Sequence, residues 1–300
     1  MTLGAGGTLS VTYGAVAGNT ADVYFDVTGF FVPGTSGATY LALTPNRLVD
    51  TRVKNGLSAK LTAGSGVSFQ VTGRTPSVSS TNVPTNAIAV TGTLTVTGQS
   101  APGYLSLTPT VDNAPPTASL YFPKGDNRAT GLTIMLGAGG KLGVTFSSSI
   151  AGATTDVIFD VTGYFVPGGS GATYVPVTPN RLVDSRIKLG LSAKLSANVA
   201  KTFQVTGRFP TDPTRNIPTG AVAITGTLTV TGQTALGWLA LTPVANNHPT
   251  TSNLNFPKGD NRATGVTVPL GPRGKLSVTY GAVAGSTTAV VFDVSGYFVN

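Results

Sequence analysis

The feature that most constrains the fold is a long internal repeat. The run TPNRLVD occurs at residues 44–50 and again at 178–184, and FPKGDNRATG occurs at 122–131 and again at 256–265. Both pairs are separated by 134 residues (178 − 44 and 256 − 122). A constant offset of that length corresponds to a whole domain and not to one turn of a solenoid. The sequence therefore predicts two similar modules, like beads on a string. Their joint is VPGGSGATY at residues 166–174, a short flexible linker by composition.

The segment that closes each repeat occurs once more than the rest of the module. We call this segment the tail; its copies are residues 3–38, 136–172 and 270–300. The part that precedes it, the body, occurs only twice, at 40–135 and 174–269. Met1 falls opposite Ile134 and Val268, inside the repeat. We predict an N-terminal tail segment over residues 1–38 and two repeat modules over residues 39–170 and 171–300.

The composition and the alternation of residues indicate an all-β fold. The chain has no Glu, and Thr, Val and Gly dominate where a helical protein would use Glu, Lys and Leu. In residues 87–97, Ile88, Val90, Leu94 and Val96 alternate with Ala and Thr, as expected for a strand with one apolar face. Frequent turn residues predict about seven to nine short strands per module, in an immunoglobulin-like or jelly-roll β-sandwich.

The surplus tail is predicted to be a β-hairpin without a partner. The residues expected to mediate its packing are Leu3, Leu9, Val11, Tyr13, Val23, Phe25, Asp26, Val27 and Phe31. An isolated hairpin is marginal in water because it buries too little surface. Two explanations remain open: the chain is a fragment of a longer array, or the tail pairs with another subunit by strand addition.

Charge and cysteine content narrow the classes of function. Charged residues make up 10% of the chain and the formal net charge is +8, but the 19 Lys and Arg are scattered and form no basic run that would bind nucleic acid. The chain has no Cys, no apolar run near the roughly 20 residues of a membrane span, and no signal peptide at its first residues. With one histidine, His248, it lacks the residues for a zinc site or a Ser-His-Asp triad, so we expect no metal, no cofactor and no enzymatic activity.

Two motifs link the chain to a known type of module. They are P-x-R-L-x-D-[TS]-R, at residues 45–52 and 179–186, and F-D-V-[TS]-G-Y-F, at 159–165 and 292–298. In these motifs the chain resembles repeat modules of secreted and surface proteins of environmental bacteria, some of which resemble protomers of extracellular fibrils. The resemblance spans nearly the whole chain, although the N-terminal tail has Phe30 where the other copies have tyrosine. It implies a structural role and assigns no catalytic residue.

The arginines and aspartates of these motifs are predicted to form structural ion pairs. Asp160 lies in the middle of an apolar strand, and a carboxylate there is costly to bury without an arginine such as Arg47 or Arg52. The predicted set comprises Arg47, Asp50, Arg52 and Asp160 in the first repeat, and Arg181, Asp184, Arg186 and Asp293 in the second. Asp26 has no such arginine upstream, so we expect it to reach an arginine of another module or another copy of the chain.

Two further features are candidate sites. The loop Lys124–Arg128 is expected to be a β-turn capped by Asp126 and Asn127, since it lacks the dense oxygen ligands of a calcium loop. Tyr104 and Trp238 are expected on the solvent-exposed face of their strands. There the aromatic ring either packs at an edge beside Gly237 or contacts a sugar.

From the sequence we therefore expect a structural subunit of an extracellular filament or surface layer. Its partner would be the chain itself, in a homopolymer held by β-strand contacts between modules. Cell-surface or attached glycans are further expected partners, because O-linked sugar on the Thr-rich faces remains open. The alternative is a carbohydrate-binding or adhesive surface module.

Overall fold

The computed structural model describes residues 3–34, 36–74, 82–169, 171–209, 212 and 214–300. Its regular structure consists of antiparallel strands and three short 3-10 turns, Ala5–Gly7, Thr51–Val53 and Pro272–Gly274, with no α-helix among these residues. The prediction of an all-β fold is confirmed. Met1 and Thr2 lie outside the described residues.

Residues 39–166 form the first module, a sandwich of two sheets. One sheet has the order β1-β9-β4-β7, with β2 paired to β9, and the other has the order β3-β8-β5-β6. The strands are β1 (Thr39–Asp50), β2 (Leu61–Thr62), β3 (Val67–Gln70), β4 (Ala89–Thr97), β5 (Gly103–Thr108), β6 (Leu120–Phe122), β7 (Arg128–Met135), β8 (Lys141–Ser147) and β9 (Thr154–Val166).

Residues 173–299 form the second module with the same topology. Its sheets have the orders β10-β18-β13-β16, with β11 paired to β18, and β12-β17-β14-β15. The strands are β10 (Thr173–Asp184), β11 (Leu195–Ser196), β12 (Lys201–Gln204), β13 (Ala221–Thr231), β14 (Gly237–Thr242), β15 (Leu254–Phe256), β16 (Arg262–Pro269), β17 (Lys275–Ala282) and β18 (Thr287–Val299).

Each module has its own core between its two sheets. The alternation along β4 places Val90, Leu94 and Val96 in this core, where they pack with side chains of the opposite sheet such as Phe146. Burying an aliphatic or aromatic side chain of this kind contributes roughly 1.5–3 kcal/mol, so a module with this many buried side chains has a substantial core.

The two strands of each tail do not pair with each other, which corrects the predicted hairpin. β8 lies between β3 and β5 in one sheet, and β9 lies between β1 and β4 in the other. The connection between β8 and β9 therefore crosses from one sheet to the other. A tail supplies a central strand to each of the two sheets of its module, so a body without a tail lacks the middle of both sheets.

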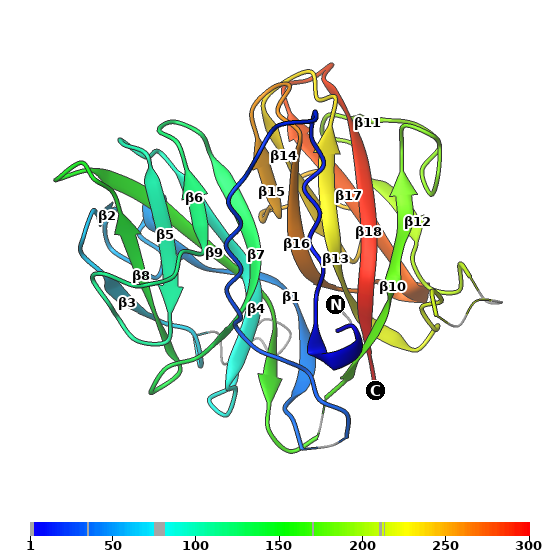
Figure 1. The fold of residues 1–300 in the computed structure, drawn as a ribbon, viewed down its shortest axis with the longest axis horizontal. Coiled ribbons are helices and arrows are strands. Elements are labelled where there is room, and N and C mark those ends of the chain that lie inside the picture. The colour runs from blue at the N-terminus through cyan, green and yellow to red at the C-terminus, as the bar shows by residue number, and fades with distance from the viewer. Residues whose placement is uncertain (1–2, 35, 75–81, 170, 210–211, 213) are drawn as a thin grey trace.

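The two modules lie side by side and share a buried interface (Figure 1). Tyr40, Phe165, Ala172, Ala223 and Phe298 form an apolar cluster between them. The linker between the modules is held by a hydrogen bond as well, since the amide of Tyr40 donates to the carbonyl of Ala172 at 2.9 Å. The two modules are therefore packed against each other and are not joined by a flexible linker alone.

The N-terminal tail is extended and has no strand pairing in its described part. In Figure 1 it runs up over β13 of the second module, turns, and runs down along β7 of the first. Its residues 3–34 are exposed throughout.

Candidate assembly interface

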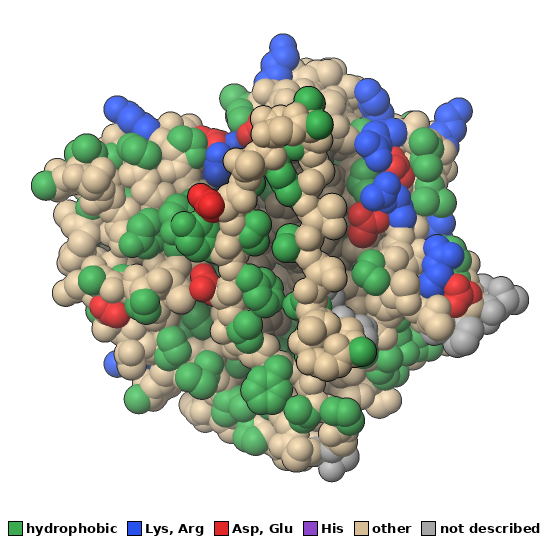
Figure 2. Space-filling view, viewed as in Figure 1, with side chains coloured by type: hydrophobic (Ala, Val, Ile, Leu, Met, Phe, Trp, Pro, Cys, Tyr) green, Lys and Arg blue, Asp and Glu red, His purple; other side chains and the backbone are tan. Residues whose placement is uncertain are grey.

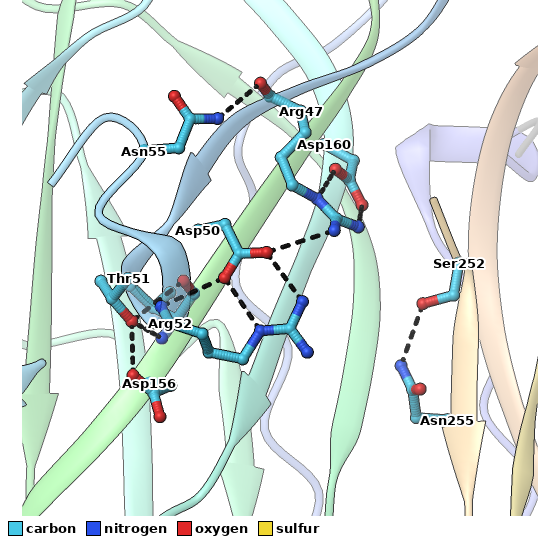
Figure 3. A network of polar contacts seen from close by, with 10 residues as sticks. Arg47, Asp50, Thr51, Arg52, Asn55, Asp156, Asp160, Ser252 and Asn255 are labelled. Atoms are coloured by element: carbon cyan, nitrogen blue, oxygen red, sulfur yellow. Dashed lines mark hydrogen bonds and ion pairs between the residues drawn. The ribbon is translucent and has the colours of Figure 1, made fainter. Parts of the chain in front are cut away.

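The first module contains a buried arginine–aspartate network on the outer face of its β1-β9-β4-β7 sheet (Figure 3). The register of β1 and β9 places Arg47 opposite Asp160. Arg47 donates from Nε to Asp160 Oδ1 at 2.8 Å and from Nη2 to Asp160 Oδ2 at 3.1 Å. Burial raises the pKa of Asp160, an effect that the two hydrogen bonds from Arg47 oppose. The pair thus has the bidentate geometry that makes a buried carboxylate tolerable.

Asp50 connects a second arginine to this network. Arg52 donates from Nε and Nη2 to the Asp50 carboxylate at 2.9 and 2.7 Å, and Arg47 Nη1 donates to it at 3.2 Å. The hydrogen bonds from Arg52, together with the positive charges of both arginines, hold the pKa of Asp50 below its usual value. Asp50 therefore stays charged at neutral pH and fixes the turn that follows β1.

The second module repeats this network with the same partners but in a more open setting. Arg181 Nε donates to Asp293 at 2.8 Å, and Arg186 Nη2 donates to Asp184 at 2.6 Å. The side chain of Asp293 is 31% exposed, whereas that of its counterpart Asp160 is 2% exposed. The difference arises because the second module covers this face of the first, while nothing of comparable size covers the same face of the second.

The contact between the modules joins two different surfaces. The first module contributes what we call the threonine face, the outer face of β4 and β9 with Thr91, Thr93, Thr95 and Asp160, all of which are buried. The second module contributes its edge surface, which comprises Asn253, β15 and residues 262–266 of β16. Asn253 Nδ2 lies 3.5 Å from Thr93 Oγ1 in this contact.

A second group of contacts joins β7 to β16. The amide of Gly131 donates to Thr264 Oγ1 at 3.0 Å, and a Cβ on Gly131 would lie 1.9 Å from the carbonyl oxygen of Gly265. Glycine is therefore required at residue 131 for the two strands to approach this closely. Arg262 forms an ion pair with Asp126 and donates to the carbonyl of Asn127 at 3.2 Å. The loop predicted to be a self-contained turn is thus part of the interface.

Because the modules are repeats, copies of both surfaces remain open elsewhere on the chain. Asp260, the counterpart of Asp126, is 46% exposed at its side chain, compared with 14% for Asp126. Gly265, the counterpart of Gly131, has no atom within 4 Å of a Cβ built on it. The second module therefore presents an open copy of the threonine face. In the first module the copy of the edge surface is open in part: Arg128, the counterpart of Arg262, is 34% exposed at its side chain, compared with 11% for Arg262, whereas Gly131 of β7 already contacts β16. Such a contact between unlike surfaces is heterologous, and it can be repeated.

A groove between the modules contains one of the two predicted ligand contacts. Trp238 lies over the backbone of Gly281 on the neighbouring strand, where a Cβ would be 2.0 Å from its ring. Its strand β14 lies between β15 and β17, so the ring does not pack at a sheet edge as we expected. Trp238 lines a groove of about 180 Å³ with Arg47, Arg52 and Asn255. Tyr104, its counterpart, instead pairs with Tyr121, with ring centroids 5.1 Å apart.

The N-terminal tail exposes the apolar side chains that its two sequence copies bury. Phe25 is 73% exposed, whereas its counterpart Phe159 is 1% exposed. The other predicted assembly residues of apolar type, Leu3, Leu9, Val11, Tyr13, Val23, Val27 and Phe31, are all exposed as well. Their role in assembly stays a prediction.

Asp26 has no cationic partner among the described residues of the chain and is exposed. The sequence predicted an arginine of another module or of another copy of the chain, and the described part of this chain provides none. Asp26 instead lines a cavity of about 380 Å³ between the tail, β7 and β16. A pairing with an arginine outside this chain stays a prediction.

The described residues contain no cluster of His, Asp, Glu or Cys that could hold a metal ion. His248 is exposed in the loop after β14, where its amide donates to Asn246. Within the described part of the chain, no helix is both long and apolar enough to cross a membrane.

Comparisons with known proteins show likeness in structure alone. No family model and no curated protein matches the sequence. Among solved structures, the CBM22-1-CBM22-2 tandem domain of Paenibacillus barcinonensis Xyn10C matches 85% of this chain and 99% of its own, with 11% identity and a TM-score of 0.22. A structure of Sulfolobus Turreted Icosahedral Virus matches 91% of this chain and 100% of its own, with 13% identity and a TM-score of 0.17. Likeness this weak supports no inference about what this chain binds or builds.

Proposed function

We propose that this protein is a non-enzymatic structural subunit of an extracellular filament or surface layer, built by packing β-sandwich modules against one another. The observation that carries the proposal is the heterologous contact between the two modules, together with the copies of both of its surfaces that are open in full or in part. A heterologous contact with open copies at both ends adds further modules by the same geometry, in a closed ring where the rotation between modules closes and in an open filament where it does not.

The state of the carboxylates supports a structural role and not a catalytic one. The aspartates of the two networks, Asp50, Asp160, Asp184 and Asp293, all accept hydrogen bonds from arginine. A general acid or base needs a carboxylate that can exchange its proton with a substrate. Bidentate arginine contacts stabilise the charged form, so these groups serve to hold β1 to β9 and β10 to β18.

The mode of assembly that we propose differs from addition of a strand to a sheet edge. Each of the four sheets contains strands of one module only, and the modules meet through side chains of the threonine face and the edge surface. Self-association would use the same contacts. The resemblance to bacterial surface modules and the low content of charged residues support an extracellular location, in contact with its own copies and with cell-surface glycans.

The proposal is tested by removing charges on the open surfaces. Arg128→Ala acts on the open part of the edge surface and Asp260→Ala on the open threonine-face side. Arg128 also pairs with Asp126 and Asp260 with Arg262, but the Arg262–Asp126 ion pair that joins the two modules is retained in both variants. We expect both variants to fold like the parent protein and to assemble less, as measured by light scattering and by electron microscopy of negatively stained material. Unchanged assembly of the double variant would refute the proposal.

A second candidate function, carbohydrate binding, is favoured by the groove at Trp238. It combines the ring of Trp238 with the side chains of Arg47 and Arg52, which are paired with aspartates, and with hydroxyl and amide side chains such as Ser252 and Asn255, a set suited to a polar sugar. Figure 3 shows Arg47 and Arg52 on one side, and Ser252 and Asn255 on the other. Its volume of about 180 Å³ is below the roughly 300 Å³ of ordinary ligand pockets, so it would hold only a short part of a glycan.

Glycan-array binding that is lost in Trp238→Ala and retained in Tyr104→Ala would favour this second function. Tyr104 is the matched control because it occupies the same position in the first module but does not line the groove. Equal binding by both variants would argue against a site at Trp238.

A further inference from the structure

The N-terminal tail carries the sequence of two central strands without the sheets that receive them. Leu9, Val11 and Tyr13 correspond to Leu142, Val144 and Phe146 of β8, and residues 20–32 correspond to β9. In both complete modules these strands have neighbours on both sides. The described residues of the N-terminal tail have no strand neighbours, and the component that would supply them is a body of the same type.

Three phenylalanines at the centre of the molecule show where that body would lie. Phe31, Phe165 and Phe298 occupy the same position in the three tails. Their ring centroids are 6.2 Å apart for Phe31–Phe165, 6.1 Å for Phe31–Phe298 and 6.2 Å for Phe165–Phe298. Three equivalent residues at nearly equal separations are arranged about a pseudo-threefold axis. The N-terminal tail supplies the third position.

The contacts of Phe31 with the second module repeat those of Phe298 with the first. Phe298 stacks on Tyr40 with centroids 4.2 Å apart and an interplanar angle of 31°. Phe31 stacks on Tyr174, the counterpart of Tyr40, with centroids 4.2 Å apart and an angle of 29°. The N-terminal tail therefore meets the second module as the second module meets the first.

The contacts of Asp26 and Thr28 agree with the same rotation about the pseudo-threefold axis. In the existing interface β9 contacts β16. In the N-terminal tail, Asp26 and Thr28, the counterparts of Asp160 and Thr162 in β9, line a cavity together with residues 130–134 of β7, the counterpart of β16. Figure 2 shows a hollow between the two legs of the tail, and Figure 1 shows one leg over each module.

We infer that this chain binds a further copy of the module body, one without its own last two strands, and that the N-terminal tail completes it into a third module. The three modules then close a ring about the phenylalanine cluster, in which each threonine face meets the next edge surface. The inference rests on the proposed packing of modules. It also explains why Asp26 lacks an arginine: that arginine belongs to the absent body, at the position of Arg47 and Arg181.

The test is a three-body chain in which residues 173–268 are placed directly ahead of Thr2, the register in which bodies and tails are joined elsewhere in the sequence. We expect the amide protons of residues 9–13 and 23–27 to exchange about a hundredfold more slowly than in the parent chain, because they would enter two sheets. We expect small-angle scattering to give a radius of gyration of about 21 Å, the value for a compact chain of roughly 395 residues.

Asp26→Asn serves as a matched probe of the third module. In the three-body chain it should lower the melting temperature, because the added arginine loses its carboxylate partner, whereas in the parent chain it should change nothing. Equal effects in the two chains, or unprotected amides in the tail, would overturn the inference.

Gly265→Ala separates folding of the third module from ring closure. By the rotation that relates the modules, residue 265 would approach the added body as Gly131 approaches Gly265, so the variant should raise the radius of gyration and leave the tail amides protected. If the three-body chain that retains Gly265 protects the tail amides but has a radius of gyration well above 21 Å, the third module folds and the ring does not close. That result would contradict the ring, and it would leave the proposed contact between the first two modules unaffected. Separation of those two modules in the parent chain would instead refute the proposed function.

Discussion

The ring of Phe31 stacks on that of Tyr174 at a centroid distance of 4.2 Å, the same distance that joins Phe298 to Tyr40. The two pairs are related by the internal repeat, yet the first joins an isolated tail to a module and the second joins two complete modules. The position of the N-terminal tail is therefore set by a contact that belongs to the packing of modules, and not by pairing within the tail.

Phe31→Ala is expected to release the N-terminal tail from the second module. Loss of an aromatic pair costs about 1 kcal/mol, which is roughly a fivefold change in the equilibrium between the docked and the free tail. Limited proteolysis within residues 3–34 should accelerate by about that factor. Phe30→Ala is the control, because Phe30 is exposed and contacts no other ring among the described residues, and it should leave the rate unchanged.

Arg47→Met should destabilise the protein far more than Arg181→Met. The first change leaves the carboxylate of Asp160 buried without its main partner, at a cost of about 3–5 kcal/mol. The second leaves Asp293, which is partly exposed, and exposed ion pairs contribute about 0–1 kcal/mol. Urea denaturation at neutral pH measures both free energies of unfolding. Equal losses would show that the second module does not cover the first network in solution.

Gly131→Ala and Gly265→Ala form a pair with opposite expected outcomes. A Cβ at residue 131 would collide with the backbone of Gly265, so the modules must shift, at a cost of about 1–3 kcal/mol. A Cβ at residue 265 meets no atom within 4 Å, so that variant should unfold like the parent chain. Thermal unfolding followed by circular dichroism distinguishes them, and a tolerated alanine at residue 131 would argue against the close approach of β7 and β16.

The stability that Asp50 contributes should depend on pH in one direction. Its pKa in the folded protein is held below the ordinary value of 3.8, chiefly by the hydrogen bonds from Arg52, so the folded protein favours the charged form. The contribution is complete above that ordinary value and is lost as the pH falls through the lower, folded value. The difference in unfolding free energy between the parent chain and Asp50→Asn should therefore shrink between pH 6 and pH 3. A difference that grows on acidification would contradict the assignment.

The modules and their ion pairs could be anticipated because they depend on local alternation and on charge burial. The alternation in residues 87–97 places Val90, Leu94 and Val96 correctly in the core, whereas Ile88, just ahead of β4, is exposed. A carboxylate at Asp160 within an apolar strand required an arginine, which the register of β1 supplies from Arg47. Both arguments depend only on the residues of one strand or on one pair of opposite charges.

The sheet to which each tail strand belongs could not be read from the alternation, because a hairpin and a crossing between two sheets have the same pattern of apolar residues. The interface between modules was missed for a related reason. Thr91, Thr93 and Thr95 alternate with the apolar residues of β4, a pattern that fits a solvent-exposed face, but hydroxyl groups are equally suited to a contact that offers polar partners such as Asn253. The buried carboxylate of Asp160 on the same face was the signal that this face is covered.

A double-mutant cycle on Asp126 and Arg262 measures whether the two modules contact each other in solution. The residues lie in different modules and form an ion pair across the interface, so the free energies of unfolding of Asp126→Ala, Arg262→Ala and the double variant should show a coupling of about 1–2 kcal/mol. The counterpart residues Arg128 and Asp260 lie at the two ends of the same chain of ion pairs, Arg128–Asp126–Arg262–Asp260, and do not contact each other, so a cycle on them should show a smaller coupling than the directly paired Asp126 and Arg262. A coupling near zero for Asp126 and Arg262 would contradict the heterologous interface and every proposal built on it.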